Sequence, residues 1–421
     1  MTNAELSVAF FLQMAVIIAA CRVVGWAAKA WLDQPQVVGE MIAGVILGPS
    51  LFGLMAPELQ AALFPAESRS VLFVGAQLGV GLYMFLVGLG FERDHFRTAA
   101  SSAAAVSVAG MAAPFLVAVA LTPWLIDMGL FGEGIVTWQA MLFMGAAISI
   151  TAFPMLARII HERGLSGTPM GSLSLSAGAI DDAGAWCVLA IVLASFGGGA
   201  MVAVKAICGG AAFAAFMLTV GPRLLAPLGR RVEREGKVSA GVLGVILILF
   251  MLCAWVMDAV GIHAVFGGFI LGVAMPRGLL TQQVRAQLEP FAVLVLLPMF
   301  FTFSGLNTQL TMVDNIGLLG VTALILVGSI LAKGGACWAA ARLTGQDNRT
   351  AMGIGALMNA RGLMELIIIN IGLQRGIIST ALFSILVLMA IVTTLMASPL
   401  FEQVYGRKAR REGLLMERAP G

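Results

Sequence analysis

Apolar residues recur along the chain in runs of about 17 to 25 residues, and short polar segments separate one run from the next. A run of this length is what an α-helix needs to cross roughly 30 Å of hydrocarbon. The pattern therefore predicts an all-α polytopic membrane protein with about thirteen transmembrane helices. The helices are expected near residues 6–24, 35–53, 71–90, 100–122, 136–160, 170–195, 200–220, 238–258, 261–276, 287–305, 316–341, 350–373 and 378–400.

The composition of the 421 residues agrees with this pattern, because 60% are hydrophobic, only 11% are charged and the mean hydropathy is +0.97. Soluble domains have roughly 45 to 50% apolar residues. A soluble enzyme is therefore excluded, and no enzymatic activity is predicted. The five cysteines lie inside apolar runs without paired spacing, so no disulfide framework, zinc site or cofactor is predicted, and nothing indicates a nucleic-acid partner.

The positions of the basic residues indicate how the chain crosses the membrane. Lysine and arginine accumulate in the cytoplasmic loops of membrane proteins. Of the 25 basic residues, twenty fall on one predicted side, and only Arg69 and Arg375 fall on the other. We therefore expect a multi-pass protein of the cell (inner) membrane with its N-terminus outside and its C-terminus in the cytoplasm. The first apolar run has Glu5 before it and its basic residues after it, unlike a cleavable signal peptide, so it should stay in the protein.

Two of the predicted spans look broken. In the fifth, the polar residues 149–151 are followed by Pro154, which lacks a backbone donor and clashes with the preceding turn. In the twelfth, Asn359, Arg361 and Gly362 interrupt an apolar run. Because these spans are seven apart, they predict two six-helix repeats of opposite orientation joined by one linking helix, with a binding site at the midplane. The alternative, that both breaks only kink packed helices, stays open.

Asp181 and Asp182 lie in the middle of the sixth span. An aspartate at this depth costs about 2.5 to 3.5 kcal/mol on insertion scales, so the pair needs a polar cavity or charged partners. Successive helical residues point about 100° apart, so one carboxylate can hold a substrate cation while the other holds a counter-charge. Proximity and burial both favour the neutral form, and this allows a proton and a cation to compete for the same oxygens. The alternative is a structural pair bound by waters.

Three further charged residues lie well inside predicted spans, away from their ends. Lys333 is far from both ends of its span, and a buried ammonium needs a carboxylate partner, for which Asp181 is the candidate. The alternative is that Lys333 snorkels to an interface. Arg361 and Glu365 are four residues apart on one helical face, which predicts a structural ion pair. Other residues near predicted helix ends are interpreted as interfacial: Glu40, Lys205, Asp258 and His263.

Three sequence motifs resemble those of the monovalent cation:proton antiporter-2 family, which includes plant cation/proton exchangers. Residues 147–158, AISITAFPMLAR, resemble its signature, and residues 359–366, NARGLMEL, resemble its later motif. Residues 36–44, QVVGEMIAG, continuing to Gly48-Pro49-Ser50, resemble its early motif. The resemblance extends from about residue 10 to 400, and three motifs in the same order are a specific signal.

The resemblance implies a sodium/proton antiporter fold, in which two broken helices cross and a mobile core moves like an elevator against a dimerisation domain. It also implies a homodimer in the lipid bilayer. The implied divisions are dimerisation-domain helices in 1–99 and 238–314, core helices in 100–198 and 315–400, a linker helix in 199–237 and a cytoplasmic basic tail in 401–421.

The resemblance also implies roles for the polar residues of the site. Asp182 would bind Na⁺ or K⁺ and, in exchange, a proton, and Asp181 would form a salt bridge with Lys333. Ser149 and Thr151, in the unwound stretch, would complete the oxygen shell of the ion. Plant exchangers of this type look more like Asn-Asp at the paired position, whereas this chain has two aspartates, as electrogenic sodium exchangers do. The choice between Na⁺ and K⁺ therefore stays open.

The sequence thus predicts a secondary active monovalent cation/proton antiporter that works by elevator-type alternating access. A cation channel is an alternative, and it would pass ions without proton coupling. A sodium-coupled organic-anion symporter on a related inverted-repeat fold is another, although paired acids are a poor host for an anion. An intramembrane aspartyl protease is disfavoured, because it needs aspartates from two helices.

Overall fold

The computed structural model describes residues 2–413 except 33, 35, 92, 166, 194, 197–199, 263, 308–315 and 412. His263 and most of the predicted tail beyond residue 411 therefore lie outside the described residues. The elements of the described chain are helices, as the apolar runs predict. Lys205 and Asp258 are exposed near helix ends, whereas Glu40, expected at an interface, is instead 1% exposed.

The described residues of the first half of the chain form nine α-helices. They are α1 (Asn3–Leu32), α2 (Gln36–Leu47), α3 (Phe52–Met55), α4 (Pro57–Leu63), α5 (Arg69–Leu89), α6 (Arg93–Asp127), α7 (Thr137–Ser149), α8 (Phe153–Glu162) and α9 (Pro169–Leu193). Two helices, α10 (Ala200–Thr219) and α11 (Gly221–Glu235), link this half to the next.

The second half is described as far as residue 413. Its helices are α12 (Ala240–Val260), α13 (Ala264–Ala274), α14 (Leu279–Phe291), α15 (Leu297–Leu306), α16 (Ile316–Leu343), α17 (Asn348–Leu357), α18 (Leu363–Gln374), α19 (Thr380–Phe401) and α20 (Arg407–Arg411). A π-helical turn, Ala292–Leu296, joins α14 to α15, so that the two continue one another.

Eight helical segments in the described residues are long and apolar enough to cross a membrane. A further pair, α10 and α11, is bent by 43° at its junction. The protein is therefore a multi-pass membrane protein, but the predicted number of thirteen spans is not confirmed. Part of the difference has a structural reason, because two predicted spans are each divided into two short helices, α7 with α8 and α17 with α18.

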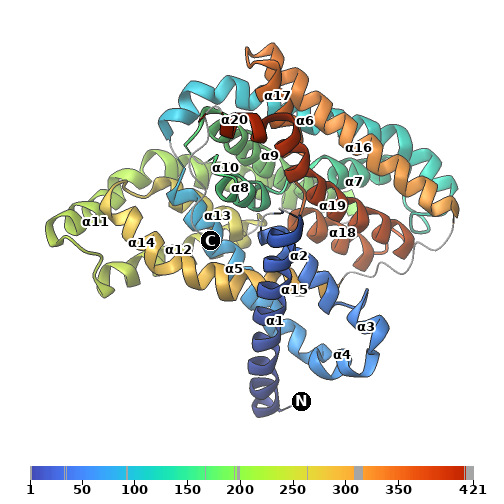
Figure 1. The fold of residues 1–421 in the computed structure, drawn as a ribbon, viewed down its shortest axis with the longest axis horizontal. Coiled ribbons are helices and arrows are strands. Elements are labelled where there is room, and N and C mark those ends of the chain that lie inside the picture. The colour runs from blue at the N-terminus through green and yellow to red at the C-terminus, as the bar shows by residue number, and fades with distance from the viewer. Residues whose placement is uncertain are drawn as a thin grey trace.

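The helices pack in two groups, which Figure 1 shows side by side. We call α1, α2, α5 and α12–α15 the scaffold group, and α6–α9 with α16–α19 the core group. Within the scaffold group, α2 and α15 approach so closely that a Cβ atom on Gly305 would lie 1.9 Å from the carbonyl oxygen of Gly44. Only glycine permits this approach, because it has no Cβ atom.

The core group has two helix breaks, one between α7 and α8 and one between α17 and α18, and a backbone hydrogen bond connects them. The backbone leaves the helix at Ile150, which has the extended angles φ −76° and ψ 139°. α8 then begins at Phe153, so Pro154 lies in a first turn, where its missing N–H group costs no helical bond. In the other break, the carbonyl oxygen of Ala360 accepts a hydrogen bond of 3.1 Å from the backbone N–H of Ala152. The two irregular segments thus satisfy part of each other's backbone inside the protein, as hydrocarbon requires.

Candidate functional site

The paired carboxylates lie deep inside the core group. Asp181 is 0% exposed and Asp182 is 2% exposed, and both belong to α9. This helix packs against α6, α7 and α8. The surroundings of the two side chains are set by those helices, by the neighbouring break between α7 and α8, and by Lys333 of α16.

Asp181 accepts hydrogen bonds on both of its carboxylate oxygens. Its Oδ1 atom accepts one from the hydroxyl of Ser107 on α6 at 2.5 Å. Its Oδ2 atom accepts one from the hydroxyl of Thr151 at 2.6 Å and one from Nζ of Lys333 on α16 at 3.2 Å. A buried carboxylate with two hydroxyl donors and one ammonium partner has its charge compensated.

Lys333 has three acceptors for its three ammonium hydrogens. Besides Asp181, they are the carbonyl oxygens of Gly110 at 3.1 Å and Ser149 at 2.5 Å. The Gly110 carbonyl lacks its usual helical donor because Pro114, four residues later inside α6, has no N–H group. The Ser149 carbonyl lies at the C-terminus of α7, where the helix itself supplies no donor. The irregularities of two other helices thus create the acceptors for this buried ammonium.

Arg361 lies in the second break rather than within a helix, since α18 begins at Leu363. Its Nη1 atom is nevertheless 3.3 Å from the Oε1 atom of Glu365, and both side chains are buried. Its Nη2 atom donates to the carbonyl oxygen of Ile148 at 2.6 Å. Lys333 and Arg361 therefore both bind the last carbonyl groups of α7, where the helix dipole is negative and favours positive charge.

Asp182 differs from its neighbour, because its Oδ1 atom is buried and has no hydrogen-bond partner among the described residues. An unpaired buried carboxylate oxygen is costly unless it is protonated or binds a cation. Among the described residues of this region, Asp181 pairs with Lys333 and Glu365 pairs with Arg361, and Asp182 has no ion-pair partner. The arrangement can therefore accommodate one additional monovalent positive charge.

The two residues predicted to complete an ion shell have other contacts in this conformation. The hydroxyl of Thr151 donates to Asp181 and lies 3.3 Å from the carbonyl oxygen of Met358. The hydroxyl of Ser149 lies 3.5 Å from the carbonyl oxygen of Ala146, within its own helix. Their role as cation ligands stays a prediction. The sequence does not indicate Ser107 as a site residue, because nothing distinguishes it from the other small residues of α6.

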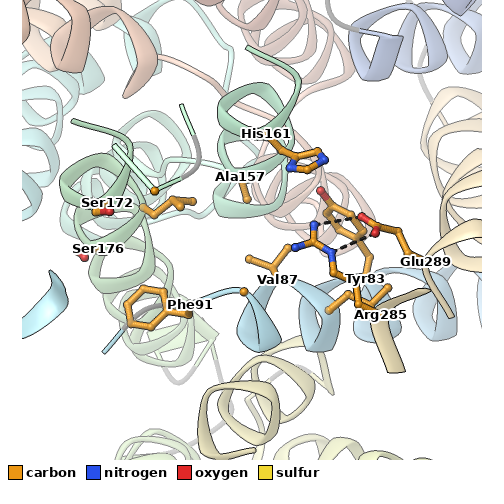
Figure 2. A pocket seen from close by; sticks show the side chains of 13 residues that line it. Tyr83, Val87, Phe91, Ala157, His161, Ser172, Ser176, Arg285 and Glu289 are labelled. Carbon is orange, nitrogen blue, oxygen red and sulfur yellow. Dashed lines mark hydrogen bonds and ion pairs between the residues drawn. The ribbon is translucent and has the colours of Figure 1, made fainter. Parts of the chain in front are cut away.

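A cavity of about 100 Å³ lies where the scaffold and core groups meet. Figure 2 shows that it is bordered by Tyr83 of α5, His161 of α8, Ser172 and Ser176 of α9, and Arg285 of α14.

The cavity is also bordered by α9, the helix that carries the two carboxylates. Leu175 lines it, and Asp182 is seven residues further along α9. Residues seven apart lie on nearly the same face of a helix, about 10 Å apart. The cavity therefore borders the face of α9 to which Asp182 belongs.

Comparisons with known proteins agree with one another. The family described as sodium/hydrogen exchanger, transmembrane, matches residues 10–403. The Na⁺/H⁺ antiporter NhaS4 of Synechocystis is 37% identical over 397 residues, which cover 93% of this chain and 95% of that protein. Cation/H⁺ antiporter 18 of Arabidopsis thaliana is 34% identical over 97% of this chain. The match covers 50% of the Arabidopsis protein, so the chain spans about half the length of that relative.

Among solved structures, the fold is similar to that of the sodium proton antiporter MjNhaP1 from Methanocaldococcus jannaschii. The TM-score is 0.66, and the match covers 97% of this chain and 99% of the other. The sequences are only 15% identical, so the likeness concerns the fold alone. It confirms the predicted sodium/proton antiporter architecture.

Proposed function

The chain belongs to the sodium/hydrogen exchanger family, and from its likeness to cation:proton antiporters of the antiporter-2 type we propose that it exchanges Na⁺ or K⁺ for protons across a membrane. The observation that carries the proposal is the buried Oδ1 atom of Asp182, which has no hydrogen-bond partner among the described residues, beside Asp181, whose two carboxylate oxygens both accept hydrogen bonds. The carboxylate of Asp181 is held by hydrogen bonds within the protein, whereas the carboxylate of Asp182 can bind an exchangeable proton or cation.

In the proposed mechanism, Asp182 holds either a proton or one alkali cation. Each of them neutralises the same surplus negative charge, so binding of one displaces the other. Asp181 keeps Lys333 near the break and releases it when Asp181 itself becomes protonated. The bound charge makes the site nearly neutral, which lowers the cost of moving it through an apolar environment.

Movement of the core group against the scaffold group would carry the site from one side of the membrane to the other. This elevator-type step is supported by the separate packing of the two groups and by the cavity at their boundary. We place the loops rich in arginine in the cytoplasm. Gly90 and Gly167 lie at the ends of such loops and line the cavity, so the cavity faces the cytoplasm.

Two chains would associate through their scaffold groups.

The test uses the purified chain in proteoliposomes that are acidic inside and contain a pH-sensitive dye. Addition of Na⁺, K⁺ and Li⁺ in turn should raise the internal pH with at least one of these ions. A protonophore added first should abolish the signal, because it removes the proton gradient. Cation flux that continues without any proton movement would contradict the proposal and indicate a channel.

A further inference from the structure

Arg158 on α8 lies between two glutamates that belong to different helix groups. Its Nη2 atom is 3.6 Å from the Oε1 atom of Glu40 on α2, in the scaffold group. Its Nε atom donates to the Oε1 atom of Glu162, one turn further along α8, at 2.8 Å. Arg158 and Glu40 are 7% and 1% exposed. A buried arginine of the core group is therefore paired with a buried carboxylate of the scaffold group.

Backbone and amide groups of α2 extend this contact. The backbone N–H of Gln36 donates to the Oε2 atom of Glu162 at 2.6 Å. The side-chain amide of Gln36 donates to the Oε1 atom of Glu40 at 3.1 Å. These residues belong to the motifs at 36–44 and 147–158 or lie just beyond them, and the cation site described above does not use them. The first turn of α2 thus holds the charged end of α8.

The contact between Glu40 and Arg158 is only partly satisfied. The Oε2 atom of Glu40 and the Nη1 atom of Arg158 are buried, and neither has a hydrogen-bond partner among the described residues. Buried charges that lack part of their hydrogen bonds gain less from the contact, so the pair can separate more readily than a fully bonded one. By contrast, the pair of Arg158 and Glu162 lies within α8 and would move with it.

The position of the pair relates it to the cavity at the boundary of the two groups. Ala157 and His161, on the same helix as Arg158, line that cavity together with residues of α5 and α14. A displacement of α8 by one helical turn, about 5.4 Å, would take Arg158 out of reach of Glu40 and rearrange this side of the cavity. The contact between the two groups and the opening of the cavity therefore depend on the same placement of α8.

We propose that Glu40 and Arg158 form an interdomain latch that stabilises the conformation whose cavity opens toward the arginine-rich loops, and that opens in every transport cycle. This inference rests on the proposed alternating-access function. Glu40 and Arg158 are positioning residues, because they act through the placement of α8 rather than on the transported ion.

The latch predicts a measurable asymmetry between the two faces of the membrane. The apparent affinity of a site scales with the fraction of molecules that present it to the solution. Loss of the latch should therefore raise the apparent KM for the cation on the membrane face that carries the arginine-rich loops. It should lower the apparent KM on the opposite face. The ratio of the two KM values should change by about fivefold, the lower end of typical coupling effects. A merely structural role would lower the maximal rate and leave this ratio unchanged.

The experiment compares right-side-out and inverted membrane vesicles that contain the full chain. Na⁺-dependent proton movement is measured in both, or K⁺-dependent movement if wild type responds to K⁺ alone. The variants are E40Q, R158Q and the exchanged pair E40R/R158E. R231Q is the control, because Arg231 also pairs with a glutamate, Glu235. That pair lies within the single helix α11, and its side chains are far more exposed than those of Glu40 and Arg158.

Both E40Q and R158Q should shift the KM ratio in the same direction, R231Q should keep the wild-type ratio, and E40R/R158E should move the ratio back toward wild type. If E40Q does not reach the membrane, E40D replaces it and should give a smaller shift. A wild-type ratio in the glutamate and arginine variants would overturn the latch. Absence of exchange by wild type in both kinds of vesicle would instead overturn the proposed function.

Discussion

The two neighbouring carboxylates of α9 have opposite surroundings. Asp181 accepts hydrogen bonds from Ser107, Thr151 and Lys333, whereas Asp182 has a buried oxygen with no partner among the described residues. Their side chains start one residue apart, about 100° around the same helix. The difference therefore comes from the elements packed on each face of α9, and it separates a carboxylate that maintains the structure from one that is available for exchange.

The largest effect is expected from replacing Asp182, the residue proposed to bind the exchanged proton or cation. D182N should lower cation/proton exchange at least about 100-fold, because the amide cannot alternate between a proton and a cation. Its thermal stability should stay at or above that of wild type, since an unpaired buried charge is removed. D127N is the matched control, because Asp127 is exposed at the end of α6, and it should transport normally. Near-normal exchange by D182N in proteoliposomes would remove Asp182 from the mechanism.

The next largest effect is expected on stability, from removing Lys333, the buried partner of Asp181. K333M should destabilise the protein by about 3 to 5 kcal/mol, because it leaves the Asp181 carboxylate buried without its cation. The double variant D181N/K333M should recover most of this loss, since neither charge then remains. Thermal unfolding in detergent measures both variants. An unstable double variant together with a stable K333M would show that the pair is not what holds this region.

A smaller effect concerns the hydroxyl donors of Asp181. S107A removes the donor to Oδ1 and should cost about 2 kcal/mol, as expected for a hydrogen bond to a charged group. S101A is a control on the same helix, because Ser101 is exposed. The two alanine variants are compared by thermal unfolding, and equal stabilities would mean that Ser107 does not support Asp181.

The smallest effect concerns Asp347, a carboxylate that has several donors but lies at the surface. Its side chain accepts from the backbone N–H groups of Arg349 and Thr350 at the start of α17. The side-chain hydrogen bond from Thr350, followed by these backbone donors, lowers the pKa of Asp347 below its ordinary value of 3.8. D347A should cost about 1 kcal/mol at neutral pH, as the loss of a helix cap does.

The pH dependence of this cap has a definite sign. Because the folded pKa is lowered, the stabilisation is fully present above the ordinary value of 3.8 and is lost as the pH falls through the folded pKa. The stability difference between wild type and D347A should therefore shrink in strong acid. A difference that is constant at every pH would contradict this role of the carboxylate.

The sequence predicts those parts of the site that follow from local rules. A buried lysine needs a carboxylate, and Lys333 lies 3.2 Å from Asp181. Interrupted apolar runs indicated the two breaks, which lie between α7 and α8 and between α17 and α18. The sodium/proton antiporter fold, inferred from three motifs, is confirmed by the structural match.

The contacts between distant helices could not be predicted from the sequence. The carbonyl of Gly110 becomes an acceptor for Lys333 only because Pro114 frees it and α16 packs against α6. Glu40 looked interfacial because it lies near a predicted helix end, but α8 covers it and Arg158 supplies its partner. Such pairings depend on three-dimensional packing, which the order of residues along one helix does not encode.

The most direct test of the central claim is the number of protons released when a cation binds. The purified chain in detergent at weakly buffered pH receives Na⁺ or K⁺, and a pH indicator reports the protons. Wild type should release up to one proton per chain, with an apparent cation affinity that weakens as the pH falls, and D182N should release none. Cation binding that releases no proton from wild type at any pH, or the same release from D182N, would contradict the account.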